Sequence, residues 1–302
     1  MEGLPVGVVA IGLVGLVAIA VAQGGEDPNV KAIEAAAPDA APAKPAKPRK
    51  VLVYGRVPTH GDCVRYCFQT IEILGKKTSA FETVCSGDPK VFLPESLKQF
   101  DAVVMNNTHE ATPFLPLNLK DLTLDEQNEA KGLEEALKKS FQDFLTEGKG
   151  LVGIHGASCS VKWPQYMEML GGTYAGHTGG SAWIKAEDPA HPLCAMLPKE
   201  GFEASDEFYI LGGPYSRTKL RVLTSLDLTK TDDPQKLKVK DYPVSWIREC
   251  GKGRVFYCSL GHSLASYKSP HVLRHVLAGI QYAIGDLAAD ATPSEKPSAP
   301  RP

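Results

Sequence analysis

The chain has 302 residues, of which 43% are hydrophobic and 23% are charged. This is enough for one large domain or two small ones with a sizeable core. The formal net charge is -2, so the composition excludes an electrostatic argument for nucleic acid or a membrane surface as partner.

The first residues form an apolar segment. From Pro5 to Ala22 nearly every residue is Val, Ala, Gly, Ile or Leu, and Glu2 is the only charged side chain there. Its length suits a bilayer span, and its last three residues fit a small-residue cleavage site. We interpret residues 1–23 as a signal peptide or an uncleaved membrane anchor, with a mistaken start codon as the third reading. A signal peptide or an anchor would place the folded part outside the cytoplasm, as a periplasmic, secreted or membrane-anchored protein.

Two segments have the composition of disordered chain. Residues 24–48 are rich in Ala, Pro, Lys and Asp and have no apolar periodicity, which predicts a disordered linker. Residues 287–302 have the same character and are predicted to be a disordered tail. The folded domain is therefore expected at residues 49–286.

The first part of this domain alternates strands with helices. Thr123 followed by Glu126 predicts a capping box at the start of the longest helix, and Gly148 is a natural stop after it. The β-α-β-α order predicts a mostly parallel sheet with helices on both faces. The expected elements are a strand at 50–54, a helix at 62–74, strands at 81–84 and 100–105, a helix at 124–146 and a strand at 150–154.

The second part is richer in strands. Lys252-Gly253-Arg254 is typical of a hairpin turn between the last two of them. The expected elements are strands at 182–186, 221–226, 244–249 and 254–260, and a closing helix at 271–284.

The segment from Gly150 to Ala157 reads as a buried strand that ends in Gly-Ile-His-Gly-Ala. Such a break predicts a sharp strand-to-helix turn, which exposes one side chain at the carboxyl edge of the sheet as nucleophile elbows do. The exposed residue would be the imidazole of His155.

Histidines follow several of the predicted strands. His60, His109, His155 and His262 each come after a different strand, and carboxyl ends of parallel strands form the edge where ligands bind. His177 and the acidic pair Asp206-Glu207 are expected on loops near the same edge. A single histidine is more often structural, and the two acidic residues could be ordinary loop charges. The shared position favours a site.

Converging histidines with a carboxylate suit two chemistries, a divalent metal such as zinc or proton transfer near neutral pH. For proton transfer we expect His155, His262 and Glu207 to be catalytic. A metal would be held by His60, His155, His177, Glu207 and His262. Ligand contacts are expected from Asn106, Asn107, Thr108, Tyr174, Asp206 and Trp246.

The seven cysteines include no C-x-x-C pair, which excludes zinc ribbons and thioredoxin-like motifs. Most are expected to be small buried side chains. Cys159 lies four residues after His155, and packing is a better interpretation for it than a reactive thiol.

Several blocks, in this order, resemble the ThuA-like (trehalose utilisation) family of the class I glutamine amidotransferase-like superfamily. They are residues 150–157, 170–177, 206–209 and 243–262. The resemblance implies a flavodoxin-like three-layer α/β sandwich and a role in disaccharide or keto-sugar metabolism. The family tends to have Arg-His-Asp-Ser after the first strand, where this chain has Thr59-His60-Gly61-Asp62.

Three functions are compatible with these observations. The first is a carbohydrate-active enzyme, a hydrolase, lyase or isomerase, which acts on a sugar at the histidine-rich edge. The second is a membrane-tethered sugar-binding module without turnover. The third, a glutamine amidotransferase, needs a cysteine thiolate at the elbow. Because His155 stands there, we expect no such activity.

Overall fold

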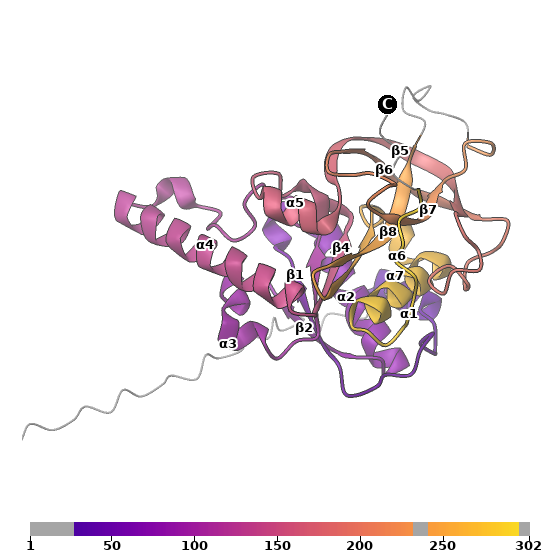
Figure 1. Ribbon diagram of the computed structural model, residues 1–302, viewed down its shortest axis with the longest axis horizontal. Coiled ribbons are helices and arrows are strands. Elements are labelled where there is room, and N and C mark those ends of the chain that lie inside the picture. The colour runs from indigo at the N-terminus through magenta and orange to yellow at the C-terminus, as the bar shows by residue number, and fades with distance from the viewer. Residues whose placement is uncertain (1–26, 232–240, 296–302) are drawn as a thin grey trace, which may run out of the picture.

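The computed structural model describes residues 27–231 and 241–295, without the side chains of Val57, Thr59 and His60. The predicted signal or anchor at residues 1–23 lies outside these ranges. The described chain is a mixed α/β fold around one nine-stranded sheet. Figure 1 shows the helices packed beside this sheet. In the described ranges, no helix combines the length and the hydropathy that a membrane span requires.

One half of the sheet is parallel. Its strands are short apolar runs, and every residue of the third and fourth is buried, as expected for strands covered on both faces. The second strand begins one residue later than predicted. The parallel strands, in sheet order, are β2 (Glu82–Ser86), β1 (Lys50–Tyr54), β3 (Ala102–Asn106), β4 (Gly150–Ile154) and β9 (Gly253–Cys258).

The other half of the sheet is antiparallel, which corrects the prediction of a mostly parallel sheet. Four of the eight described strand pairings are antiparallel. A two-residue turn with Gly251 at φ 60° joins the last two strands, and so short a connection can only return the chain antiparallel. These strands are β8 (Pro243–Cys250), β7 (Arg221–Leu226), β5 (Thr173–Ala186) and β6 (Phe202–Gly212).

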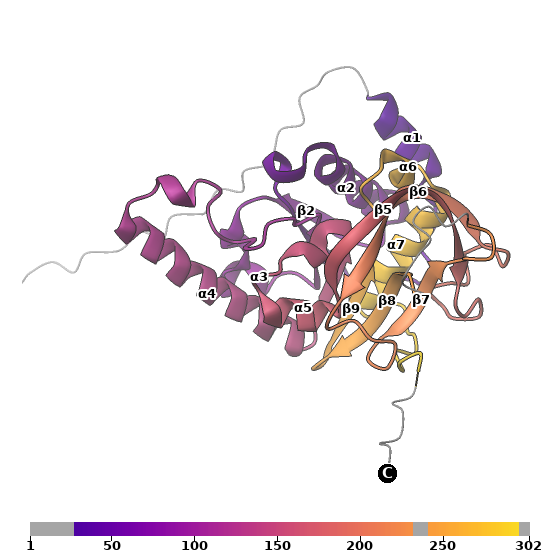
Figure 2. The same ribbon diagram turned by 90° about the horizontal axis from the view of Figure 1, so that it is seen from above.

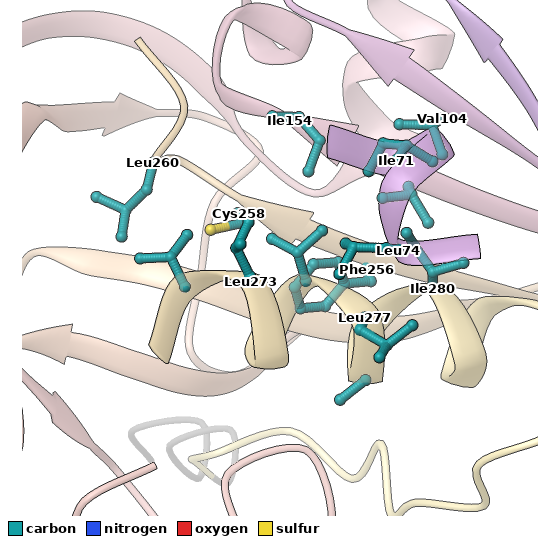
Figure 3. Close-up of a cluster of buried hydrophobic side chains, with 14 of the residues drawn as sticks. Ile71, Leu74, Val104, Ile154, Phe256, Cys258, Leu260, Leu273, Leu277 and Ile280 are labelled. Atoms are coloured by element: carbon teal, nitrogen blue, oxygen red, sulfur yellow. The ribbon is translucent and has the colours of Figure 1, made fainter. Parts of the chain in front are cut away.

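Helices cover both faces of the parallel half. On one face, α2 (Val57–Thr78) and α7 (Pro270–Ala283) bury apolar side chains against alternate strand residues (Figure 3). On the other face lie α3 (Pro94–Leu97), α4 (Leu124–Thr146) and α5 (Pro164–Leu170). The predicted capping box of Thr123 and Glu126 is present at the start of α4.

Helix α2 begins five residues before the predicted start. Pro58 lies in its first turn, where backbone N–H groups have no acceptor within the helix, so proline breaks no helical hydrogen bond. Thr59 and His60 therefore belong to the helix and not to a loop after β1.

The segment before β1 is ordered and packed, which corrects the predicted linker over its described part. Residues 28–36 form α1 (Pro28–Ala36), which lies beside α2 (Figure 2). Ile33 is fully buried. Further along, the side-chain amide of Gln281 pairs with the backbone of Ala43 at 2.9 and 2.6 Å, and Arg49 forms an ion pair with Asp286. The Pro- and Ala-rich composition did not reveal these distant partners.

The described part of the predicted tail is also attached to the domain. The backbone N–H of Ser294 donates to the carbonyl of Leu220, and that of Glu295 donates to Arg217. Leu287 packs against the hydrophobic core. The tail is therefore bound beside the start of β7 up to residue 295.

Candidate functional site

The turn after β4 has the sharp geometry that the sequence predicts. The 3-10 helix η3 (His155–Cys159) follows the strand directly, and His155 has φ 45°, a left-handed conformation that is uncommon for a residue with a Cβ atom. A Cβ atom at Gly156 would lie 2.2 Å from Nε2 of His109. Glycine at 156 therefore allows the His109 ring to cover the turn.

The side chain of His155 is fully buried and not exposed at the sheet edge. Its Nδ1 lies 2.7 Å from the carbonyl oxygen of Ser259, and its Nε2 lies 2.7 Å from the hydroxyl of Tyr209. Burial raises the pKa of Tyr209 far above its ordinary value, so this phenol keeps its proton. Because a carbonyl oxygen only accepts, Nδ1 donates to Ser259. Both ring nitrogens of His155 therefore have partners inside the protein, and the catalytic role of His155 stays a prediction.

The β5–β6 hairpin supplies most of the remaining groups. His177 pairs with Tyr209 and Gly179 pairs with Glu207 across the hairpin. Glu207 and Tyr209 are two residues apart on one strand, so they share a face. On β5 the Tyr174 hydroxyl lies 2.7 Å from Nδ1 of His177.

Glu207 lies between three imidazoles. Its Oε1 is 3.5 Å from Nε2 of His177 and 3.7 Å from Nε2 of His262, and its Oε2 is 3.4 Å from Nε2 of His155. His262 reaches this point from the loop after β9. We call these four residues, together with Tyr174 and Tyr209, the Glu207 cluster. It joins four of the five residues predicted as metal ligands.

The histidines keep Glu207 ionised. The pKa of its carboxyl is lowered to about 2, first by the side-chain hydrogen bond with His155 and then by the charges of His262, His155 and His177, against the opposing effect of partial burial. His155 Nε2 thus faces two oxygens. The Tyr209 hydroxyl at 2.7 Å and the Glu207 carboxylate at 3.4 Å both lie within reach of this nitrogen. The side chains of His177 and His262 are 42% and 41% exposed, so they face solvent from this carboxylate.

Four of the residues predicted to bind substrate are buried inside the protein and have internal partners or neighbours. Asn106 donates to the carbonyl of Val64, and Asn107 donates to the side chain of Asn106. The indole of Trp246 donates to the carbonyl of Leu170 within the core. The four residues, all between 0% and 1% exposed, are Asn106, Asn107, Thr108 and Trp246. Tyr174 differs from them because it is only half-buried.

Asp206 lies within strand β6 and not on the loop that the sequence predicted. It is buried, and its carboxylate accepts hydrogen bonds from the backbone N–H groups of Gly261, His262 and Ser263. A carboxylate filled by internal donors is not available to a ligand. Asp206 therefore binds the backbone of the loop that contains His262.

The residues do not fit a metal centre as arranged. The side chain of His60 lies outside the described part of the chain. Both ring nitrogens of His155 are already in hydrogen bonds inside the protein. Among the described residues, no group of three or more His, Cys, Asp and Glu side chains is arranged to hold an ion.

Cys159 is a thiol and not a thiolate. Burial, together with the charge of Glu207, raises its pKa to about 12, against the effect of a hydrogen bond with Tyr209. A nucleophilic cysteine needs the opposite shift. All seven cysteines are within the described ranges, and none forms a disulfide.

The sequence did not predict the two groups that bind the ring of His155. Tyr209 orients His155, and the carbonyl of Ser259 orients it from the other side. The spacing of Tyr209 from Glu207 would have indicated a shared face if residues 202–212 had been recognised as a strand. No sequence signal marks a backbone carbonyl.

The family model for ThuA, described as trehalose utilisation, matches residues 50–283. The chain belongs to the ThuA family. This family is part of the class I glutamine amidotransferase-like superfamily. No curated protein matches the chain.

Solved structures of three proteins share the fold. A ThuA-like protein from Bacteroides uniformis has a TM-score of 0.60 at 20% identity, over 80% of this chain and 94% of its own. A ThuA-like protein from Parabacteroides merdae has a TM-score of 0.57 at 17% identity, over 83% and 95%. A cytoplasmic protein from Salmonella typhimurium has a TM-score of 0.52 at 10% identity, over 78% and 98%. At these identities the likeness shows the fold alone.

Proposed function

We propose that this ThuA family protein acts on a sugar ligand at the Glu207 cluster by transferring protons. The observation that supports it most is the position of one ionised carboxylate among three imidazoles, two of them open to solvent. Imidazoles exchange protons near neutral pH. The family's association with trehalose utilisation supports a sugar as the ligand.

The roles of the groups follow from their acidity and exposure. A carboxylate with a pKa of about 2 is a weak base, so Glu207 orients the imidazoles and stabilises their positive charge. His177 and His262 then transfer the protons. One ring accepts a proton from a sugar hydroxyl, or from a carbon beside a carbonyl. The other, as imidazolium, donates a proton to an oxygen of the ligand.

Tyr174 is the proposed contact surface for the sugar. Its ring lies edge-on to Tyr209 at 4.7 Å, and its hydroxyl binds His177. A half-exposed aromatic ring beside the reacting groups suits stacking on the apolar face of a sugar.

The test uses the full chain with trehalose, other disaccharides and their keto derivatives. Calorimetry measures binding, and NMR of the mixture detects products. We expect Glu207→Gln to lower kcat by about 10²-fold or more, because the imidazolium loses its counter-charge. Glu203→Gln, an exposed carboxylate on the same strand, is the matched control and should retain full turnover.

Other outcomes of these measurements would assign a different function. Binding without any product would identify a sugar-binding module. Stoichiometric zinc in the active protein would replace the proton-transfer assignment by a metal site. If neither trehalose nor any other sugar of the panel binds, the proposal is wrong.

We also propose that the parallel half of the sheet is flavodoxin-like. Its strand order, β2-β1-β3-β4-β9, matches the flavodoxin order 2-1-3-4-5 with β9 in the fifth place. His155 and His262 then follow two adjacent strands of this half, at the carboxyl edge where ligands bind in such sheets.

For the location of the protein we propose export through residues 1–23, with the domain outside the cytoplasm. The apolar run from Pro5 to Ala22 supports this proposal. Cell fractionation with N-terminal sequencing tests it. A start after Ala22 indicates a cleaved signal, an intact apolar segment in the membrane fraction indicates an anchor, and an intact cytoplasmic chain contradicts export.

A further inference from the structure

One buried carboxylate holds the loop between β9 and α6 (Leu264–Tyr267). The Oδ1 atom of Asp206 lies 2.8 Å from the backbone nitrogen of Glu207, and 3.1 Å from those of His262 and Ser263. Its Oδ2 lies 2.8 Å from the nitrogen of Gly261 and also accepts from the hydroxyl of Ser266. Five donors on two segments of the chain therefore converge on one side chain.

The opposite side of the loop is held as well. The hydroxyl of Tyr267 donates to the carbonyl oxygen of Gly261 at 2.6 Å. Gly261 has φ 135°, and a Cβ atom there would lie 2.9 Å from Ile154 and 3.4 Å from Cβ of His155. The loop thus lies against the His155 turn. The backbone N–H of Gly261 is bound by Asp206, and its carbonyl oxygen is bound by Tyr267.

Successive residues of a strand point to opposite faces. Asp206 therefore binds the backbone of the loop on one face of β6, while Glu207 meets the His262 ring on the other. A shift of the loop relative to Asp206 changes the 3.7 Å separation of His262 and Glu207. Misplacement of a reacting group by about 1 Å can cost 10²-fold in rate.

We propose that Asp206 is the positioning residue that sets His262 against Glu207. It touches no ligand and moves no proton. This inference rests on the proposed function for its effect on turnover. Its effect on the loop can be measured without turnover.

The first experiment measures amide hydrogen exchange by NMR in the full chain. In the native protein we expect Gly261, His262 and Ser263 to be protected, because all three amides donate to Asp206. Asp206→Asn replaces one acceptor oxygen by an NH2 group, so protection at these positions should fall at least 10-fold. Glu203→Gln removes one negative charge from the same strand and should leave the protection unchanged.

The second experiment measures kcat, KM and the number of trehalose sites per chain. For Asp206→Asn we expect kcat to fall about 10²-fold, with KM within about 3-fold and the number of sites unchanged. A purely structural role would lower the number of sites in proportion to kcat. Unchanged kcat together with unchanged amide protection would overturn the proposal.

A milder variant covers the case in which Asp206→Asn does not fold. Ser266→Ala removes one of the five donors, and we expect the same direction of change in amide protection and kcat with a smaller size. If Glu207→Gln abolishes turnover while both Asp206→Asn and Ser266→Ala retain it, Asp206 is not a positioning residue and the proposed function stands. If amide protection falls as expected but no sugar binds, the role of Asp206 in the loop stands and the proposed function fails.

Discussion

At the residue scale, Gly156 shows how closely the His155 turn is packed. The place of a Cβ atom is already taken by the ring of His109, at 2.2 to 2.7 Å from three of its atoms. This ring also lies 5.6 Å from that of His155, centroid to centroid. A methyl group here must displace His109.

Gly156→Ala is therefore expected to lower the free energy of unfolding by about 1–3 kcal/mol, the usual cost of overpacking. Urea titration measures it. Gly132→Ala is the matched control, because Gly132 lies within α4 with nothing near its missing Cβ. It should raise stability by about 0.5–1 kcal/mol through helix propensity. Equal stability of the two variants would contradict the packing argument.

A second residue-scale feature is the buried imidazole of His275. Its Nε2 lies 2.8 Å from the Ser245 hydroxyl and its Nδ1 lies 2.9 Å from the carbonyl of Leu193. Burial lowers its pKa from 6.5 to about 4, so the folded protein keeps this ring neutral. Between these values the unfolded chain binds the proton and the folded chain does not. Stability therefore falls as the pH falls from 6.5 towards 4.

From this group we expect a loss of about 2 kcal/mol in the free energy of unfolding between pH 7.5 and pH 5. His275→Gln cannot titrate and should lose correspondingly less over the same interval, although it starts from a lower stability. Urea titrations at the two pH values measure the difference. An identical loss in both proteins would exclude His275 as the cause.

At the element scale, α1 and the segment after it belong to the domain. Ile33 is fully buried in the core that α2 and α7 share. We expect Ile33→Ala to cost about 2–5 kcal/mol, as for other buried large side chains. A disordered linker would tolerate the change. Leu228→Ala, at a side chain that is 42% exposed, should stay within about 0.5 kcal/mol.

The β5–β6 hairpin is the element that sequence patterns predicted least well. Only residues 182–186 of β5 were expected as a strand, and residues 202–212 were not expected as one. Residues 175–181 contain three glycines and little apolar alternation, so their intrinsic strand propensity is low. Pairing with β6 along eleven registered positions stabilises them instead. By contrast, the apolar run of β4 and the capped helix α4 were predicted correctly, because short-range patterns specify both.

At the scale of the whole molecule, β9 joins the two halves of the sheet. It pairs in parallel with β4 and antiparallel with β8. Trp163 of the parallel half and Trp246 of β8 share one hydrophobic cluster. Unfolding of one half therefore exposes the core of the other.

We expect the two halves to unfold together. Variants that keep only Trp163 or only Trp246 should give fluorescence transitions in urea with coincident midpoints, which also coincide with the loss of circular dichroism. Two separated midpoints would show that the halves are independent units.

The sequence alone determined the mixed α/β class, the turn at His155 and the likeness to the ThuA family, because strand runs, caps and glycine positions depend on neighbours along the chain. It also indicated that His155, His177, Glu207 and His262 converge. Only the tertiary structure decided which of these side chains face solvent. Tyr209 and the carbonyl of Ser259 enclose His155, and Asp206 binds backbone amides 55 to 57 residues away. Burial and hydrogen-bond partners of this kind depend on segments that are distant in the chain, so local composition and spacing do not predict them.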